Sequence, residues 1–193
     1  TYPPTTTIDA LKQKKQIASK KSVVDFGVYA AVCDENIGRI RELAPLCNGF
    51  KIFLGSTTHS LKLSNHHLQV ALREINRTKK ITLFHAEDEF CLKTHMDREQ
   101  TLVDHIRCRA AECEETALKN ILTNAAGLSS PIHICHLSSC EGFEMIRKRS
   151  PNISVGVTPH HLFFDVQYFF ELFAFTSTSG SRNIFKIKFY SFS

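Results

Sequence analysis

The sequence has 193 residues, of which 42% are hydrophobic and 22% are charged, and this is the size and composition of one folded domain. The formal net charge is +5 at pH 7, partly from a lysine-rich stretch over residues 12–21. No aromatic residues stand between these lysines to stack on bases, so we expect a solvated helix face and no nucleic-acid partner. No segment approaches the roughly 20 apolar residues of a membrane span, and the first residues lack the plan of a signal peptide, so we expect no membrane association.

The number and spacing of the cysteines indicate whether they are expected to be thiols or disulfides, and so in which cellular compartment the protein is expected. The chain has seven cysteines and no C-x-x-C pair, a pattern that argues against both a disulfide framework and a zinc ribbon. We therefore expect reduced thiols in the core of a cytoplasmic protein.

Strand-like and helical patterns alternate along the chain. Runs rich in β-branched and aromatic residues predict strands at 23–32, 49–56, 81–85, 131–139 and 153–161, and apolar spacing with capping residues predicts helices at 7–19, 35–43, 64–75, 110–126 and 141–149. A longer polar passage lies between 86 and about 107. Strand and helix in alternation predict an α/β fold with a parallel sheet. Beyond Phe164 the sequence is rich in Phe without a clean period, so we expect a domain at 1–164 and a tail of uncertain structure at 165–193.

Several predicted strands carry a Lys or His near the end, where an apolar residue would be expected. The three that we single out are Lys51, His85 and His136. Polar residues that perform chemistry gather at the carboxyl ends of parallel strands, and their origin in several strands favours a barrel over an open sheet. Alternation within a strand places Lys51 on the same face as Phe53, and His85 on the same face as Leu83 and Ile81. In the same way, His136 shares a face with Ile134 and Ile132. His133 falls on the opposite face from His136, and we expect it to pack against the protein or its helices.

The types of these residues suggest a metal site. Neutral imidazoles and carboxylates are ligands for zinc-type ions. A lysine ammonium has no lone pair, so Lys51 would have to lose its proton or become a carbamate by reaction with carbon dioxide. The alternative for each residue alone is structural: a hydrogen-bonded core histidine, or a lysine that extends its ammonium to solvent.

The sequence resembles dihydroorotase, in the cyclic amidohydrolase group of the metal-dependent amidohydrolases. The matching words run in order from residue 1 to about 164. They are TYPPTTT at 1–7, VDFG at 24–27, FKIFLGS at 50–56, FHAEDE at 84–89, Arg107 with Ala111 and Glu112, HICHLSS at 133–139 followed by Glu141 and Gly142, and VTPHHL at 157–162. Singly these words are weak, but together they are specific.

The resemblance implies a TIM-like barrel with a binuclear zinc site, in which a carboxylated lysine and two single histidines are ligands. Those roles fall on Lys51, His85 and His136. It also implies reversible hydrolysis of the cyclic amide of dihydroorotate to carbamoyl aspartate, a reaction of pyrimidine biosynthesis. The partner is then a small-molecule substrate, and the protein is a homo-oligomer or part of a larger polypeptide.

The sequence also departs from the family pattern. The His-x-His metal pair and the substrate-binding arginine of the first barrel strand do not precede Thr1, and no Ser-Asp-His-Ala-Pro word supplies a proton-shuttling aspartate, so the catalytic residue is unknown. About five of eight strand–helix units and three of six metal ligands are present. We therefore expect an internal fragment with a partial barrel and with little or no activity alone.

Three further positions carry alternatives. Thr58, in the loop after the Lys51 strand, and His160, at the end of the last predicted strand, are expected to contact substrate, although Thr58 is also typical of a solvated loop and His160 of simple packing. The acidic run Glu87–Glu89 either supports His85 or begins a helix. Within the family the alternatives are dihydropyrimidinase and allantoinase, and outside it a noncatalytic partner-binding relative.

Overall fold

The computed structural model of the chain describes residues 3–56, 61–96, 109–148 and 152–163. Five strands are present, β1 (Tyr29–Val32), β2 (Gly49–Phe53), β3 (Ile81–His85), β4 (Ile132–Ile134) and β5 (Ile153–Val155). The α-helices are α1 (Ile8–Lys21), α2 (Ile40–Leu43), α3 (Asn65–Thr78), α4 (Glu89–Met96), α6 (Ala111–Asn124), α7 (Cys140–Arg147) and α8 (Pro159–Phe163), and 3-10 turns η1 (Ile37–Arg39) and η2 (Ala44–Leu46) flank α2. The expected tail at 165–193 lies outside the described residues.

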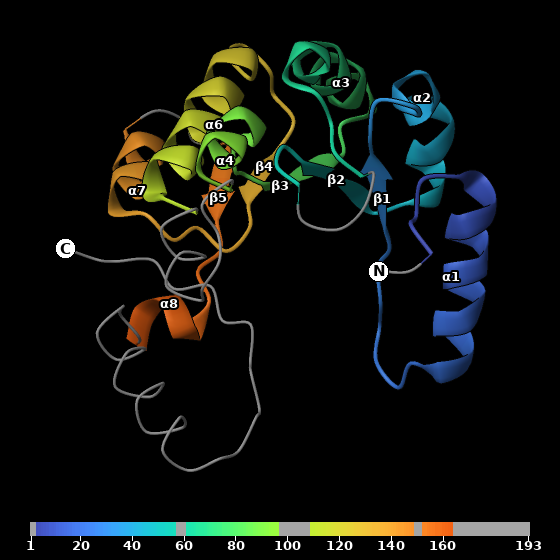
Figure 1. The fold of residues 1–193 in the computed structure, drawn as a ribbon. Coiled ribbons are helices and arrows are strands. Elements are labelled where there is room, and N and C mark those ends of the chain that lie inside the picture. The colour runs from blue at the N-terminus through green and yellow to red at the C-terminus, as the bar shows by residue number, and fades with distance from the viewer. Residues whose placement is uncertain (1–2, 57–60, 97–108, 149–151, 164–193) are drawn as a thin grey trace.

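The five strands form one sheet in the order β1-β2-β3-β4-β5, and every neighbouring pair is parallel. Helices α1, α2, α3, α6 and α7 follow one another in an arc along one side of this sheet, and α8 lies on the other side (Figure 1). This is the arrangement of successive strand–helix units in a barrel wall. The predicted α/β fold with a parallel sheet is confirmed.

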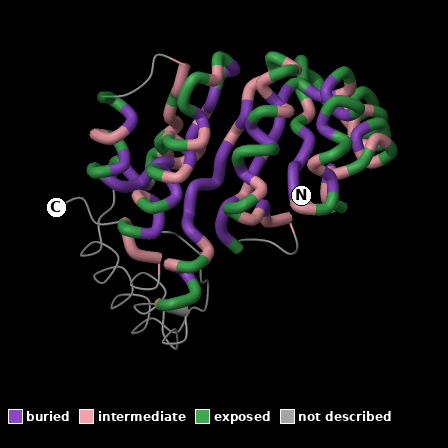
Figure 2. The backbone as a smooth tube through the Cα atoms, turned by 90° about the horizontal axis from the view of Figure 1, so that it is seen from above, coloured by how far each residue is buried: buried purple, intermediate pink, exposed green. Residues whose placement is uncertain are grey.

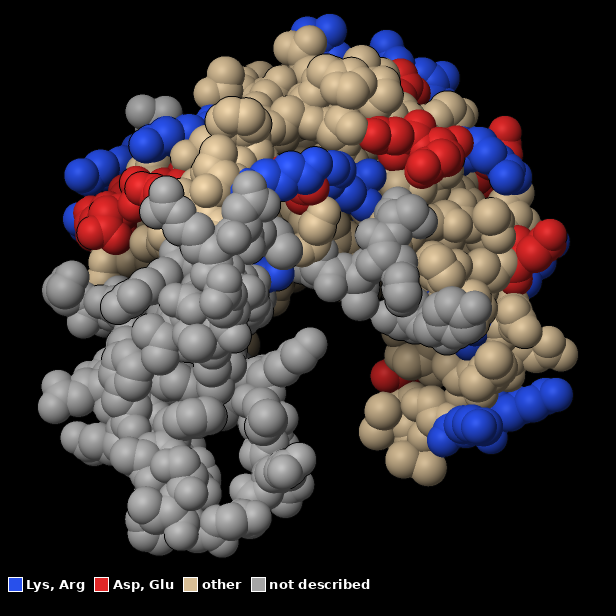
Figure 3. Space-filling view, in the orientation of Figure 1, with Lys and Arg blue, Asp and Glu red and all other residues tan. Residues whose placement is uncertain are grey.

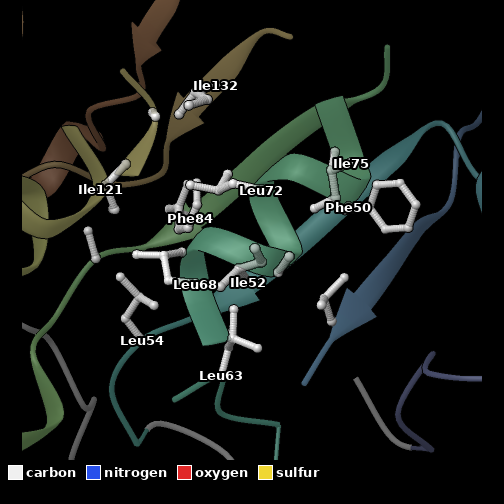
Figure 4. Close-up of a cluster of buried hydrophobic side chains, with 14 of the residues drawn as sticks. Phe50, Ile52, Leu54, Leu63, Leu68, Leu72, Ile75, Phe84, Ile121 and Ile132 are labelled. Atoms are coloured by element: carbon white, nitrogen blue, oxygen red, sulfur yellow. The ribbon is translucent and has the colours of Figure 1, made fainter. Parts of the chain in front are cut away.

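The core lies between the sheet and the arc of helices. Phe50 and Ile52 of β2 and Phe84 of β3 are fully buried and point toward α3, which supplies Leu68, Ala71, Leu72 and Ile75 (Figure 4). These four α3 positions have the spacing that puts them on one helix face, as the sequence predicted. In Figure 2 the buried backbone follows the strands and the inward sides of the helices.

The first predicted strand and the second predicted helix differ from what is observed. The strand expected over 23–32 begins only at Tyr29, because Val23 and Val24 lie in solvent with 98% and 72% exposure. The helix expected over 35–43 is divided into a 3-10 turn and a single α-turn. A further 3-10 turn that contains Pro45 follows, because proline is tolerated in the first turn of a helix. The polar passage contains α4.

The expectation of thiols throughout the chain is wrong for one pair, because Cys91 of α4 and Cys113 of α6 form a disulfide. Their Cα atoms are 5.3 Å apart, within the range that a disulfide spans. This pairing could not be predicted from the sequence, because 22 positions separate the two residues. Among the other described cysteines, Cys33 and Cys47 are buried thiols.

Charged side chains are mixed over the helical surface. On the face in Figure 3, Lys and Arg atoms lie beside Asp and Glu atoms over much of the described surface. Examples are the exposed pairs Arg39–Glu42 and Arg147–Glu144. In the described part of the chain, no helix combines the length and apolar character that a membrane crossing requires.

Candidate metal centre

The inner face of the sheet, opposite α3, carries the Lys and His residues of the strands. The pairing register aligns Lys51 of β2 with Leu83 of β3, His133 of β4 and Ser154 of β5, so these four side chains share that face. One step further along, Phe53 aligns with His85. Lys51 therefore lies with Phe53, and His85 with Leu83, as the alternation predicted.

His133 is not directed toward the helices. Its neighbours Ile132 and Ile134 occupy the helix-side core, so His133 faces inward, where its Nδ1 lies 2.9 Å from Ser154 Oγ. A side chain added at Gly156 would meet the imidazole of His133 at 3.0 Å, so the glycine leaves room for the ring. The prediction that His133 faces the helices is wrong, whereas its packing against the protein is confirmed.

His85 ends β3 and is buried, with 4% exposure. Its ring centroid lies 5.9 Å from that of Phe53 and 4.8 Å from that of His136. Its Nε2 lies 2.5 Å from Glu87 Oε2, which also accepts a hydrogen bond of 2.7 Å from Arg109 Nη1. When the imidazole is neutral and donates to this carboxylate through Nε2, its lone pair is on Nδ1.

His136 reaches His85 by a route that strand alternation did not predict. The sequence placed it on the face of Ile132 and Ile134, but β4 ends at Ile134 and His136 lies in a turn with a φ of +43°. This left-handed conformation is uncommon for a residue with a side chain, and it turns the imidazole to the inner face. His136 Nε2 then lies 3.1 Å from His85 Nδ1.

The turn at His136 is held from both sides. Leu137 N donates to Gly156 O at 2.8 Å. On the other side, buried Glu114 of α6 accepts from the backbone N–H groups of Ser138 and Ser139 at 3.2 and 2.7 Å. Burial raises the pKa of the Glu114 carboxyl, and the hydrogen bonds from these two serines oppose that shift.

Lys51 shares neighbouring side chains with the two histidines. Its Nζ is 5.0 Å from the Phe53 ring centroid, and the same ring contacts His85. Burial lowers the pKa of Lys51, and a hydrogen bond with the thiol of Cys135, the residue before His136, opposes that shift. A lowered pKa increases the share of neutral amine, the form that can react with carbon dioxide.

The two imidazoles fit a zinc-type ion. With zinc–nitrogen bonds of about 2.0–2.1 Å and tetrahedral angles, two ligand nitrogens stand about 3.3 Å apart. The distance between His85 Nδ1 and His136 Nε2 is 3.1 Å, and the Nε2 of His85 is bound to a carboxylate, as is usual for a metal-bound histidine.

The remaining candidates are the acidic run Glu87–Glu89, Thr58 and His160, each of which had a functional and a structural interpretation. Glu87 supports His85, whereas Glu89 begins α4 and accepts bonds from Ser56 N and Oγ at 2.7 and 2.9 Å. Thr58 lies outside the described residues. The sequence predicted His160 at the end of the last strand, and this prediction is wrong. The strand ends at Val155, and His160 lies within α8. The side chain of His160 lies outside the described residues.

Arg109 and Glu114 are functional candidates that the sequence prediction missed. Arg109 contacts Glu87 across 22 positions, and Glu114 contacts Ser138 across 24. Contacts between residues so far apart in the sequence cannot be predicted from the periodicity of single elements. The one available signal was an acidic residue at a buried position of a helix face, since Glu114 lies among Cys113, Ala117 and Leu118.

Comparison with known proteins shows which proteins the chain resembles. No protein-family model matches the sequence. The chain is 35% identical to a dihydroorotase of Methanosarcina acetivorans, over 91% of this chain and 40% of the relative, and 36% identical to a dihydroorotase of Methanosarcina mazei, over 84% and 39%. The chain is therefore similar in sequence to part of the dihydroorotases of two species. An allantoinase of Streptomyces avermitilis is 29% identical over 83% of this chain and 38% of the relative.

Solved structures support the fold of the chain. The L-hydantoinase (dihydropyrimidinase) of Arthrobacter aurescens matches with a TM-score of 0.79 at 21% identity, over 86% of this chain and 39% of that one. A dihydroorotase of Saccharomyces cerevisiae matches with a TM-score of 0.63 at 18% identity, over 86% and 48%. The chain spans about two fifths of the length of the curated relatives it matches, and its five-stranded sheet corresponds to part of the fold of these solved structures.

Proposed function

We propose that this chain supplies part of the zinc site of a cyclic amide hydrolase of the dihydroorotase type. Lys51, His85 and His136 are the proposed ligands. The observation that carries the proposal is the approach of His85 Nδ1 and His136 Nε2 to 3.1 Å at the ends of neighbouring strands. Sequence similarity to dihydroorotases along most of the chain supports the assignment to this class of reaction.

Each residue has a separate task in this proposal. Bound zinc would supply a Lewis acid for the amide carbonyl and lower the pKa of a water molecule. His85 and His136 would bind through nitrogen lone pairs, and Lys51 through a carbamate oxygen. Glu87 holds the His85 ring through Nε2, and Arg109 holds the charge of Glu87 in place.

The proposed substrate is dihydroorotate, opened to carbamoyl aspartate or formed from it, within pyrimidine biosynthesis. Thr58 and His160 remain proposed substrate contacts. The relatives support the choice of dihydroorotate, because dihydroorotases of two Methanosarcina species match at higher identity than the allantoinase. A cytoplasmic location stays a prediction.

The chain should turn over little or no substrate by itself. The family's His-x-His pair and proton-shuttling aspartate have no counterpart in the sequence. A metal held by an incomplete ligand set lacks the fixed, closed geometry on which catalysis depends.

Metal content of the purified chain tests the site. After the disulfide form of the chain is incubated with zinc and bicarbonate and loosely bound ions are removed, we expect zinc to be retained by the chain and lost from His85→Ala and His136→Ala. His66→Ala is the matched control, because His66 is an exposed histidine of α3 away from the centre. Equal zinc retention by all three variants would show that His85 and His136 are not ligands.

Substrate class requires a complete barrel. Residues 1–163 can replace the matching segment of the Methanosarcina acetivorans dihydroorotase, and the chimaera can be assayed with dihydroorotate, dihydrouracil and allantoin. We expect turnover of dihydroorotate, abolished by His136→Ala and kept by His66→Ala. A folded chimaera that prefers allantoin or dihydrouracil would assign the segment to that class of amidase, and one without any turnover would favour a noncatalytic relative.

A further inference from the structure

A second group of metal-ligating side chains lies where α4 meets α6. Cys91 and His95 of α4 and Cys113 of α6 have their ligand atoms within 4.8 Å of one another. Helices α4 and α6 lie side by side in Figure 1. None of the three residues belongs to the Lys51, His85 and His136 centre.

The spacing of these residues suits a shared ion. Cys91 and His95 are four positions apart on a helix, so their side chains lie on the same face, as do the two histidines of helical zinc motifs. Cys113 enters from the first turn of α6, where the helix N-terminus favours a thiolate. Cys113 is buried and Cys91 is half-buried, while the His95 side chain is 34% exposed and gives access from solvent.

The surroundings of His95 resemble those of a metal-bound imidazole. Its Nε2 lies 3.1 Å from Glu112 Oε1, and a carboxylate on one ring nitrogen commonly orients the other toward a metal. The other nitrogen, Nδ1, lies 4.0 Å from Cys91 Sγ. In the disulfide form Nδ1 also lies 2.8 Å from the carbonyl oxygen of Cys91, a contact that a metal would replace.

We propose that the reduced chain binds one zinc-type ion through Cys91 Sγ, Cys113 Sγ and His95 Nδ1, and that the disulfide is the oxidised, metal-free state of the same site. Two thiolates and an imidazole are a ligand set that zinc prefers, and a fourth position is left for water or a carboxylate. Either state fastens α4 to α6.

The exchange between the two states balances as follows. A dithiol reductant transfers two electrons to the Cys91–Cys113 bond, which breaks to give two protein thiols, while the reductant closes its own disulfide. The ion then binds the two sulfurs as thiolates and releases their two protons to solvent. Oxidation reverses the sequence and expels the ion.

Cobalt(II) is a suitable probe because a bound thiolate gives a sulfur-to-cobalt charge-transfer absorption that imidazole and carboxylate ligands do not give. Titration of the reduced full chain should show this absorption rising to one equivalent of cobalt. The oxidised chain should not show it. Addition of zinc should displace the signal.

Variants identify the ligands. Cys91→Ser and Cys113→Ser should abolish the charge-transfer band, and His95→Ala should weaken cobalt affinity by at least about tenfold, the loss typical even for a residue that only supports a ligand. Cys140→Ser, at an exposed cysteine, and Cys135→Ser, beside the other centre, should retain the band. A band that survives Cys91→Ser and Cys113→Ser would overturn the proposal, as would its absence from the reduced wild-type chain.

A measurement on the wild-type chain covers the case in which these variants fail to fold. Zinc added to the reduced chain should slow alkylation of Cys91 and Cys113, read by peptide mass spectrometry, and leave Cys140 unchanged. Equal alkylation rates with and without zinc would contradict the proposal. Failure of this site would leave the zinc-retention test of His85 and His136 unaffected, because that test does not depend on sulfur ligands.

Discussion

At the scale of single residues, the candidate metal centre depends on buried charges that are compensated nearby. Glu87 is 4% exposed, and its carboxylate meets both His85 and the Arg109 guanidinium. An isolated carboxylate in such a position would be strongly disfavoured, so each partner matters for the other two. The arrangement fixes the orientation of the His85 ring before any ligand arrives.

Glu114 is a second buried carboxylate, and it acts on the backbone. It accepts from two N–H groups and from the Ser138 hydroxyl, in the loop that follows His136. Among the described residues no ion pair forms with Glu114, and the hydrogen bonds from Ser138 and Ser139 are what compensate its charge there. Burial disfavours the charged form of Glu114, and the same carboxylate stabilises the turn at His136 through its hydrogen bonds.

The raised pKa of Glu114 predicts a pH dependence of stability. Between its ordinary value of 4.5 and the raised folded value, the folded chain holds the proton more tightly than the unfolded chain. The contribution of this group to the free energy of unfolding is therefore fully present below 4.5 and is lost as pH rises through the folded pKa. Glu114→Gln lacks this change, so the variant should gain stability relative to wild type as pH rises, measured by urea unfolding from pH 4 to 7.

A companion substitution separates charge from hydrogen bonding. Glu114→Ala leaves two buried N–H groups without their acceptor, and we expect a loss of about 2–5 kcal/mol in the free energy of unfolding at pH 7. Glu144→Ala, at an exposed position of α7, should have little effect. The interpretation fails if Glu114→Gln and wild type have parallel pH profiles.

At the scale of elements, the start of α3 shows how a loop fastens a helix. Ser64 precedes α3 but makes no side-chain cap of its own, because its hydroxyl donates to Asp34. Asp34 also accepts from Ser64 N and lies 2.9 Å from His67 Nδ1. The loop after β1 thus binds the first turn of α3.

Asp34→Asn should weaken this connection. Burial raises the pKa of Asp34, but the bonds from Ser64 and His67 outweigh burial and lower it below 3.8 overall. Asp34 therefore stabilises the fold above its unfolded pKa, and the contribution is lost as pH falls through the lower folded value. At pH 7 we expect Asp34→Asn to lose about 1 kcal/mol, a modest figure because a third of this side chain is exposed.

Thermal or urea unfolding of this variant beside Asp25→Asn provides the comparison, since Asp25 is exposed. The difference between Asp34→Asn and wild type should shrink toward pH 3. A constant difference across that range would show that the carboxylate charge does not matter at this position.

Elements with strong periodicity were predictable from sequence, and those governed by distant contacts were not. The apolar face of α3 and the alternation around Lys51 and His85 follow from local spacing, so both were predicted. His136 was correctly expected near the site but for the wrong reason, since its left-handed turn depends on contacts with Gly156 and Glu114. The Cys91–Cys113 bond joins two helices that the sequence keeps 22 positions apart.

At the scale of the whole molecule, the two ends of the sheet differ. The outer edge of β1 is partly covered, because Ala31 N donates to Thr5 O at 2.8 Å. β5 has β4 as its single strand neighbour among the described residues. An uncovered edge strand is a template for pairing with another chain.

Apolar side chains around β5 strengthen this tendency. Val157, just after the strand, is 42% exposed, and Leu162 and Phe163 of α8 are 66% and 78% exposed. Exposed apolar side chains and an edge strand are both features that favour contact with another chain. The chain by itself should therefore self-associate through the β5 end of the sheet.

Sedimentation velocity over a range of chain concentrations measures this association. We expect the average mass of the wild-type chain to rise with concentration and Val157→Lys to reduce that rise, because a lysine beside an edge strand opposes edge-to-edge pairing. Val70→Lys is the matched control, since Val70 is 50% exposed on α3, far along the sheet from β5. A wild-type chain that stays monomeric at every concentration would refute association, and equal effects of the two lysines would place it elsewhere than at β5.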